Sequence, residues 1–287
     1  MNSMMNNNIR VADVAGVSRR LIIRIASGSL AFSTTDENNK IVYESYPLKS
    51  SISMAANLRE ALRTTPMLST SYQRVLVMVD CPVLMVPTDC FHKSEQEQLY
   101  YHAFSRQDCV SHSDLEVREQ FTVMHTVLPD LNSVAIFSLQ KDLCTVINDA
   151  FSNVYFTAAE APVWRHLHQR SYTDPHQKLY GYYHDHRMEV ISYGQNRFKF
   201  YNSFAVNNPD DALYYLLSTW KQLGFDAQHD ELFLVGDFPD EKAMAEKTQQ
   251  FLKRIFTIYP SGEFNRAAVT QIPDIPYDIV ILYMKGR

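Results

Sequence analysis

The sequence predicts an α/β fold of two halves, each with the element order β-β-β-α-β. Three observations carry this prediction. Alternating apolar segments indicate three strands, a helix and a fourth strand within residues 21–80, and the same order recurs within residues 178–237. The two segments have equal length. Each also ends in an apolar strand followed by Asp. Because few residues are identical between the halves, the internal duplication that we expect rests on element order.

The first half opens with three predicted strands separated by the turn sequences ASGS and DENN. A helix follows, in which Leu58 and Leu62 lie four residues apart and share a face. The predicted ranges are 20–25, 30–35 and 40–46 for the strands, 52–63 for the helix and 74–80 for the fourth strand.

The second half contains the most clearly marked helix of the chain. Asn208 is suited to cap it, Pro209 fits its first position, and Asp210 and Asp211 face the positive end of its dipole. Gly224 marks its end. Its apolar stripe consists of Leu213, Leu216, Leu217 and Trp220. The strands of this half are predicted at 179–183, 188–193, 197–204 and 231–237.

Further α/β elements are predicted between and after these units. A capping box of Ser94 and Glu97 predicts a helix at 95–104. The other ranges are strands at 119–128, 133–139 and 153–157, helices at 141–151 and from Pro162 onward, a helix at 240–256 and a last strand at 277–284. The polar segment 171–177 suggests a boundary, so we expect a mobile tail (1–19), a first domain (20–174) and a second domain (175–287).

Composition excludes several classes of protein. The net charge of −5 argues against a dedicated nucleic-acid binder. No apolar run reaches the length of a membrane span, and the four cysteines form no C-x-x-C pair. We therefore expect a cytoplasmic protein whose cysteines are small buried hydrophobes. The cysteines are Cys81, Cys90, Cys109 and Cys144.

Glycine usage argues against a phosphate-wrapping loop of the usual kind. The chain has 8 glycines, and no two of them lie within ten residues of each other. Loops that wrap phosphates need clustered glycines so that backbone N–H groups can approach the anion. Neither a G-x-G-x-x-G sequence nor a P-loop occurs.

Two successive β-β-β-α-β units, the first with inserted elements, resemble the actin-like ATPase superfamily, whose core is ribonuclease H-like. The stretch SVAIFSLQKDLCTVINDAFSNVYFTAAEAPVWRHL is similar to the segment that closes the first domain in pilus-assembly relatives. The whole pattern, including the ending IPYDIVILYMKG, resembles an uncharacterised bacterial family of unknown function said to share this fold. The resemblance covers about residues 20–285 and is architectural.

The resemblance implies a nucleotide site at two hairpin turns and one later strand end. Active members carry an Asp in each turn to position Mg²⁺, and a Gly-Gly turn for adenosine. The matching residues are Ser27, Gly28 and Ser29 in the first turn, Asp185 in the second, and Gly236. The first turn has no acid, and the second has no glycine.

We therefore expect a non-catalytic scaffold or binding module with an unidentified protein partner and no cofactor. The alternative is a divergent kinase or ATPase that binds ATP with Mg²⁺. The oligomeric state stays open.

The sequence His184-Asp185-His186 allows three interpretations. Asp185 and Asp237 could share Mg²⁺, or the two histidines could bind zinc. The turn could also contact an anion. The interpretation that we favour is a polar hairpin tip with solvated histidines and no metal. We also expect a cleft between the two turns, with Gly236 on one wall, that attracts anions as the histidines gain charge on acidification.

Two other clusters of polar residues stand out in the sequence. Arg165, His166, His168 and Arg170 lie close together in sequence, which suits either a solvated helix end, which we favour, or a contact with an acidic partner. Asp80 and Cys81 follow a predicted strand, a common place for chemistry in α/β folds. Because no neighbouring sequence feature would activate the thiol, we expect Cys81 to be inert.

Overall fold

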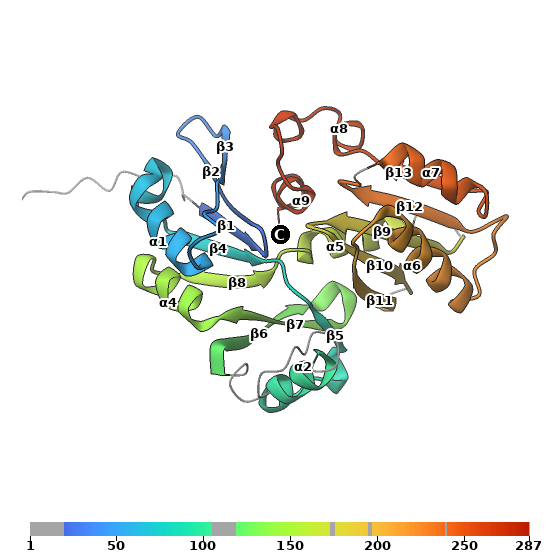
Figure 1. Ribbon diagram of the computed structural model, residues 1–287, viewed down its shortest axis with the longest axis horizontal. Coiled ribbons are helices and arrows are strands. Elements are labelled where there is room, and N and C mark those ends of the chain that lie inside the picture. The colour runs from blue at the N-terminus through green and yellow to red at the C-terminus, as the bar shows by residue number, and fades with distance from the viewer. Residues whose placement is uncertain (1–19, 105–118, 173–175, 195–196, 239, 287) are drawn as a thin grey trace, which may run out of the picture.

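The computed structural model describes residues 20–104, 119–172, 176–194, 197–238 and 240–286. Within them the chain forms two five-stranded sheets, one in each half, and a third sheet of three strands (Figure 1). The tail predicted for residues 1–19 lies outside the described residues, as does Cys109. No helix in the described part is long and apolar enough to span a bilayer.

The first sheet has the strand order β3-β2-β1-β4-β8. β1 lies at its centre, antiparallel to β2 and parallel to β4. Six of its seven residues are buried without alternation, because a central strand that is covered on both faces exposes neither side. The strands are β1 (Arg20–Ala26), β2 (Ser29–Thr35), β3 (Ile41–Tyr46), β4 (Arg74–Val79) and β8 (Val154–Ala158).

The second sheet has the order β11-β10-β9-β12-β13, so the strands of both sheets follow one arrangement: third, second, first, fourth, fifth. β9 is central, antiparallel to β10 and parallel to β12. The predicted β-β-β-α-β order of each half is therefore present. The strands are β9 (Lys178–His184), β10 (Arg187–Tyr193), β11 (Phe198–Ala205), β12 (Glu231–Gly236) and β13 (Ile255–Ile258).

The third sheet is inserted between β4 and β8 and lies beneath the first sheet in Figure 1. Its order is β5-β7-β6, and both pairings are antiparallel. β7 is buried along nearly its whole length. The inserted elements are β5 (Leu84–Pro87), α2 (Gln96–Phe104), β6 (Phe121–Leu128), β7 (Ser133–Gln140) and α4 (Lys141–Ala150).

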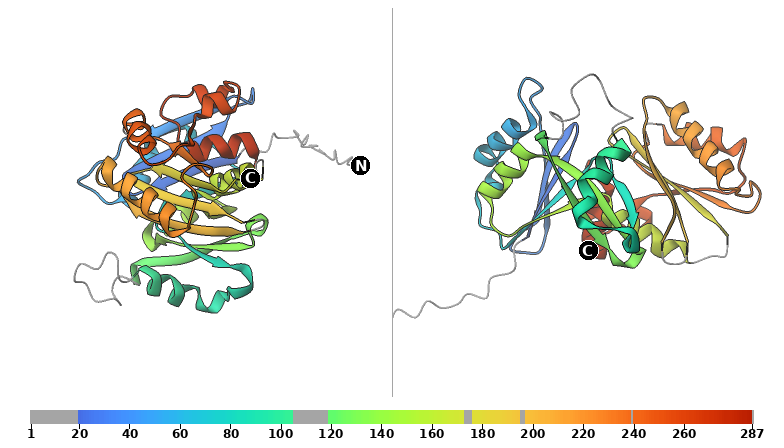
Figure 2. Two further views of the ribbon diagram at one scale, coloured as in Figure 1. Left: turned by 90° about the vertical axis from the view of Figure 1, so that its right-hand side faces the viewer. Right: turned by 90° about the horizontal axis from the view of Figure 1, so that it is seen from below.

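Helices cover the sheets and fill the space between the halves. α1 packs against α4 beside the first sheet, and α6 packs against α7 beside the second. α5 packs against α9, and both lie between the two halves in Figures 1 and 2. The helices not yet given are α1 (Met54–Thr64), α5 (Ala161–Ser171), α6 (Pro209–Gln222), α7 (Glu241–Gln249), α8 (Pro260–Glu263) and α9 (Tyr277–Lys285). Short 3₁₀ turns occupy Pro66–Ser69, Thr88–Cys90, Lys93–Glu95, Pro129–Leu131 and Ala268–Gln271.

The predicted boundaries of α6 are confirmed. The Asn208 side chain accepts hydrogen bonds from the backbone N–H groups of Asp210 and Asp211, and Asp211 completes a capping box. Gly224 lies just after the helix at φ +68°, the left-handed conformation in which glycine carries no Cβ penalty. Leu216 and Trp220 of the predicted stripe are buried against the second sheet.

The end of the chain corrects two predictions. The segment 277–284 is helical, not a strand, because a short run that is apolar on all sides has no periodicity to distinguish a buried helix from a buried strand. α9 packs Ile279 and Leu282 against Ile22 and Met78 of the first half. The helix predicted at 240–256 stops at Gln249, and β13 follows it and pairs in parallel with β12.

The start of α2 corrects a third prediction. The helix begins at Gln96, and Ser94 lies inside the 3₁₀ turn Lys93–Glu95 that precedes it. Ser94 is therefore not the residue that flanks the helix, and the expected capping box with Glu97 does not apply.

Candidate functional site

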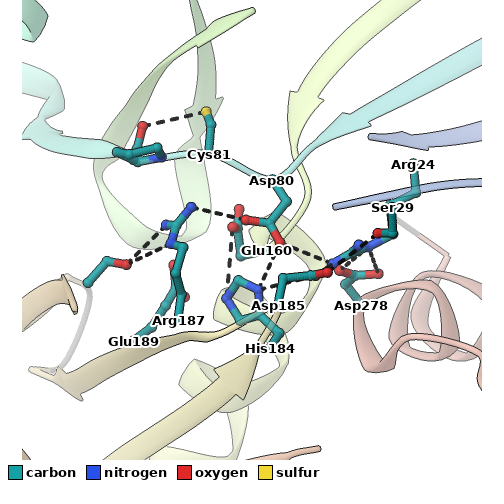
Figure 3. A network of polar contacts seen from close by, with 12 residues as sticks. Arg24, Ser29, Asp80, Cys81, Glu160, His184, Asp185, Arg187, Glu189 and Asp278 are labelled. Atoms are coloured by element: carbon teal, nitrogen blue, oxygen red, sulfur yellow. Dashed lines mark hydrogen bonds and ion pairs between the residues drawn. The ribbon is translucent and has the colours of Figure 1, made fainter. Parts of the chain in front are cut away.

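A buried ionic network joins the two halves where β1, β4 and β9 end (Figure 3). Its centre is Arg24 on β1, whose side chain is 2% exposed. Arg24 Nε donates to Asp278 Oδ2 at 2.8 Å, and Nη2 donates to Asp185 Oδ2 at 2.7 Å and to Asp80 Oδ2 at 3.3 Å. Burial alone would lower the pKa of Arg24, but the three carboxylates raise it well above its ordinary value. One cation therefore links β4, the β9–β10 turn and α9.

Asp80 extends the network toward the second sheet. Its Oδ2 lies 2.9 Å from His184 Nδ1, and its Oδ1 accepts from Arg187 Nη1 at 3.0 Å. Arg187 also donates to Ser203 Oγ on β11 at 3.0 Å. Burial opposes the charge on His184, but Asp80 and Asp185 raise the pKa of this imidazole well above its usual range. Asp80, which ends β4 of the first half, is thus held by two cations of the second half.

The two hairpin turns predicted to form a site do meet. Ser29 Oγ donates to Asp185 Oδ1 at 3.4 Å, whereas Ser27 and Gly28 are exposed at the tip of the first turn. Burial works to raise the pKa of Asp185, but its contacts with His184 and Arg24 hold it well below the ordinary value. Ser29 and Asp185 are therefore brought together, and Asp185 is an ionised partner of a protein cation.

The second turn adopts a left-handed backbone conformation without glycine. Asp185 and His186 have φ values of +42° and +59°, so two successive residues are left-handed, as in a type I′ hairpin turn. Aspartate adopts this conformation more readily than most residues. The turn is tight, with His184 paired opposite Arg187.

Gly236 has a packing role that the sequence did not indicate. Its φ is +93°, and a Cβ built there would lie 2.0 Å from the carbonyl oxygen of Tyr183 on the neighbouring strand. The N–H of Asp237 donates to that same carbonyl at 3.1 Å. Close approach of β12 to β9 thus accounts for glycine at this position. Burial raises the pKa of Asp237, and the charge of Asp185 adds to this effect.

Two further carboxylates lie deeper, beyond His184. Glu189 on β10 accepts hydrogen bonds from Trp164 Nε1 and from Tyr201 OH, both at 2.7 Å. Glu160 precedes α5 and has 0% exposure. Burial raises the pKa of both carboxyl groups, most strongly that of Glu160, whose shift the charge of Glu189 increases.

The structure corrects our preferred interpretation of His184-Asp185-His186. His184 is 5% exposed and paired with Asp80, so it is not a solvated residue; only His186 is exposed. The paired His184 also removes the basis for a histidine that gains charge between neutral and mildly acidic pH. Where the two turns meet, Asp185 contacts both Ser29 and Arg24.

The cluster around α5 also differs from the favoured interpretation, because it is not a solvated helix end. His166 and His168 are each 5% exposed. His166 Nε2 lies 2.8 Å from Glu263 Oε1, and Arg170 donates to the same oxygen at 2.7 Å. The acidic group that these residues contact is in the chain itself. Cys90 is exposed, and Cys81 and Cys144 are half-buried, so the expectation of buried cysteines is wrong for Cys90. Burial raises the pKa of the Cys81 thiol to about 12.

A groove runs between the insertion and the second sheet. β5 and β11 are edge strands, each paired on one side only. One cavity of about 640 Å³ lies between the segments 85–89 and 197–201, and another of about 620 Å³ lies between the segments 82–85 and 201–205. Tyr201 lines both, so the two cavities adjoin along β11.

Comparison with known proteins identifies the family. The sequence pattern of DUF3822, described as a protein of unknown function, matches residues 17–255. The chain belongs to the DUF3822 family. No curated protein matches this chain. A solved structure from Bacteroides thetaiotaomicron, a protein with actin-like ATPase fold and unknown function, is 25% identical with a TM-score of 0.74. The match covers 89% of this chain and 96% of that one.

A second solved structure confirms the fold class of this DUF3822 protein. The PilM-PilN type IV pilus biogenesis complex gives a TM-score of 0.54 at 11% identity, with 94% of this chain and 98% of that chain covered. The predicted actin-like fold with two β-β-β-α-β halves is therefore confirmed, as is the resemblance to an uncharacterised family with this fold.

Sequence reasoning missed most of the network, although a signal was present. Arg24 interrupts the apolar strand sequence LIIRI, Glu189 interrupts MEVISY, and Asp278 interrupts YDIVILYM. A charged residue within a segment that is otherwise buried requires a partner. Three such residues in predicted core segments indicate a buried ionic cluster, but they do not identify which residues pair.

Proposed function

We propose that this protein is a cytoplasmic, non-catalytic scaffold or binding module in which the crevice between the actin-like halves has become a fixed ionic link. The observation that carries the proposal is the contact of Arg24 with Asp185, the acid of the second turn. In phosphoryl transfer a positioned carboxylate holds Mg²⁺ or water. Here a buried guanidinium of the same chain engages that carboxylate.

Two further features support loss of nucleotide chemistry. The first turn supplies no carboxylate: Ser27 and Gly28 are exposed, and Ser29 donates to Asp185. Gly236 is accounted for by its contact with the Tyr183 carbonyl, so adenosine is not needed to explain this glycine. The three positions that resemble a nucleotide site are thus each engaged within the protein or lack the needed group.

The test is thermal unfolding with and without Mg-ATP, together with an assay of phosphate release. A ligand at 100 times its Kd adds about 2.7 kcal/mol to stability. We expect no stabilisation and no phosphate release. A stabilisation in the wild type that disappears in Asp185→Ala, with each protein compared to its own ligand-free baseline, would overturn the proposal in favour of the divergent ATPase or kinase.

The groove between β5 and β11 is the surface that we propose for a partner. Two strand edges face one groove, and an extended protein segment placed there can pair with backbone groups along either edge, as in β-strand addition. A protein of the same fold is part of a type IV pilus biogenesis complex, so the fold is compatible with a role in assembly.

The partner test compares two matched variants. Asn202→Trp places a bulky ring at an exposed position of β11 that lines the groove, and Ser45→Trp makes a comparable change on the exposed edge strand β3 of the other sheet. We expect the wild type and Ser45→Trp to capture a protein from the native host, and we expect Asn202→Trp not to capture it. Hydrogen exchange of β5 and β11 should slow in that complex. Capture that survives Asn202→Trp with unchanged exchange would contradict the groove as the site.

A further inference from the structure

Three buried side chains beneath the ionic network direct metal-ligating atoms toward one point. Glu160 lies at the start of α5 in the first half, His184 at the end of β9 and Glu189 in β10 of the second half. Their exposed fractions are 0%, 5% and 0%. One ligand atom from each lies within 4.8 Å of the others. Figure 3 shows the Glu160 carboxylate beside the His184 ring.

Unsatisfied atoms mark this point. Both carboxylate oxygens of Glu160 and Nε2 of His184 are buried and form no hydrogen bond within the described part of the chain. The separation of His184 Nε2 from Glu160 Oε1 is 3.9 Å, too long for a hydrogen bond. A buried carboxyl without a partner is costly whether it is ionised or protonated, since a protonated group still needs an acceptor for its O–H. A ligand bound between these side chains would supply the missing interactions.

The orientation of His184 suits a metal ligand. Its Nδ1 lies 2.9 Å from Asp80 Oδ2. Binding of a metal ion would displace the proton of Nε2: when Nδ1–H donates to that carboxylate, the deprotonated Nε2 directs its lone pair toward Glu160 and Glu189. Metal-bound histidines commonly have such a carboxylate on the other ring nitrogen, which fixes the tautomer and raises ligand basicity.

Glu189 is likewise positioned by its neighbours. Trp164 donates to one of its oxygens and Tyr201 to the other, both at 2.7 Å. Each carboxylate oxygen carries two lone pairs, so each keeps a free one for a cation. Hydrogen-bonded carboxylates of this kind are typical of metal ligands.

We propose that Glu160, His184 Nε2 and Glu189 bind one divalent transition-metal ion of the Zn²⁺ type. One imidazole nitrogen and two carboxylates are a ligand set that Zn²⁺ accepts. Ligands about 2.1 Å from a tetrahedral ion lie roughly 3.4 Å apart, so the 3.9 Å separation of Glu160 and His184 needs only a small adjustment. The two charges of the ion balance the two glutamates. Because Glu160 belongs to the first half and the other ligands to the second, the ion bridges the halves.

This site differs from a Mg²⁺ site for a nucleotide. The acid of the second turn, Asp185, contacts Arg24 and is not among its three ligands. The inference is also independent of the proposed scaffold role, since the test uses no nucleotide and no protein partner.

The test measures ion content and spectroscopy on the full chain. Protein from zinc-supplemented medium is analysed by plasma mass spectrometry, and protein from cobalt-supplemented medium is examined for the visible d–d bands of bound Co²⁺. We expect one ion per chain. Glu160→Gln removes one anionic ligand at constant size, and should weaken Zn²⁺ binding by at least the factor of about 10–100 seen when only an outer-shell partner is lost. Glu231→Gln is the control, because Glu231 is also buried but pairs with Arg254 outside the cluster.

The location of the ion provides the second measurement, and it does not depend on whether a variant folds. Anomalous scattering from crystals of the wild type with Zn²⁺ should give a peak between Glu160, His184 and Glu189. A peak elsewhere, including one on Asp80 and Asp185, overturns the proposal. Wild-type protein without bound Zn²⁺ or Co²⁺ overturns it as well. Equal ion content in Glu160→Gln and Glu231→Gln would also overturn the proposal.

Discussion

Arg24 and Asp185 come from opposite halves of the chain, and their side chains meet at 2.7 Å. Arg24 lies on the central strand of the first sheet, and Asp185 lies in the turn that follows the central strand of the second. The same guanidinium contacts Asp80 and Asp278, so three carboxylates share one positive charge. The two halves are thus joined by a partly buried ionic contact at the place where the resemblance to actin-like ATPases implies a nucleotide.

Arg24→Met should strongly destabilise the protein. The change keeps an apolar stem but leaves Asp278 buried without its cation and removes one of the three cations that contact Asp80. Breaking a buried pair from one side costs about 3–5 kcal/mol. The free energy of unfolding in urea measures the effect. Arg59→Met is the control, because Arg59 is exposed on α1 and surface changes stay within about 0.5 kcal/mol. Equal stability of the two variants would show that the network contributes little.

The elements predicted well from the sequence are those with a local signal. The strands around the ASGS and Asp185-His186 turns have alternating or continuous apolar runs bounded by turn residues. α6 has its Asn208 cap and Gly224 end in the sequence itself. Because the same order of such elements occurs twice, the two β-β-β-α-β halves followed from local patterns, whereas the actin-like fold came from the resemblance to a known superfamily.

The features that were not predicted depend on tertiary contacts. Residues 277–284 form a helix that is buried between the halves. Such a helix is apolar on all sides, so its sequence carries no periodic signal from which it could be predicted. Of the site residues, Ser29 and Asp185 lie in contact, but their partner Arg24 lies on a strand and pairs with Asp185 across more than 150 residues of sequence. His184 pairs with Asp80, which lies 104 residues away in the sequence.

Gly236→Ala and Gly28→Ala should differ sharply in stability. At Gly236 the new Cβ would lie 2.0 Å from a backbone carbonyl, and the φ of +93° is unfavourable for alanine. At Gly28 no atom lies within 4 Å of a new Cβ. We expect Gly236→Ala to lose at least about 1–3 kcal/mol, the cost of such strained backbone alone, and Gly28→Ala to change little. Melting temperatures of the two variants provide the comparison. If both are neutral, the strand contact is not what requires glycine at position 236.

Cys90 should be alkylated much faster than Cys81. Only the thiolate is nucleophilic, and burial raises the pKa of Cys81 to about 12, so this thiol stays protonated at neutral and mildly alkaline pH. Cys90 is exposed. Iodoacetamide labelling near pH 8, read by peptide mass spectrometry, gives the two rates separately. Rapid labelling of Cys81 in the folded protein would instead point to an activated thiol.

Glu263 connects the segment after β13 to α5 and α9. It accepts from Arg170 at 2.7 Å and from Tyr277 OH at 2.9 Å, and His166 Nε2 lies 2.8 Å from it. Burial works to raise the pKa of Glu263, but these partners, His166 foremost, hold it below its ordinary value near 4.5. Folding therefore favours the ionised carboxylate.

The contribution of Glu263 to stability should disappear in acid. A carboxyl whose folded pKa is depressed stabilises the protein fully above its unfolded value near 4.5, and the contribution is lost as pH falls from there through the lower folded pKa. Hence Glu263→Gln should cost about 1.5–3 kcal/mol at pH 7, as expected for hydrogen bonds to a charged group, and progressively less below pH 4.5. Urea unfolding of both proteins across this range tests the prediction. Glu246→Gln, at an exposed residue of α7, should show no such trend. A Glu263→Gln deficit that stays constant down to acidic pH would mean that shape, and not charge, determines the role of Glu263.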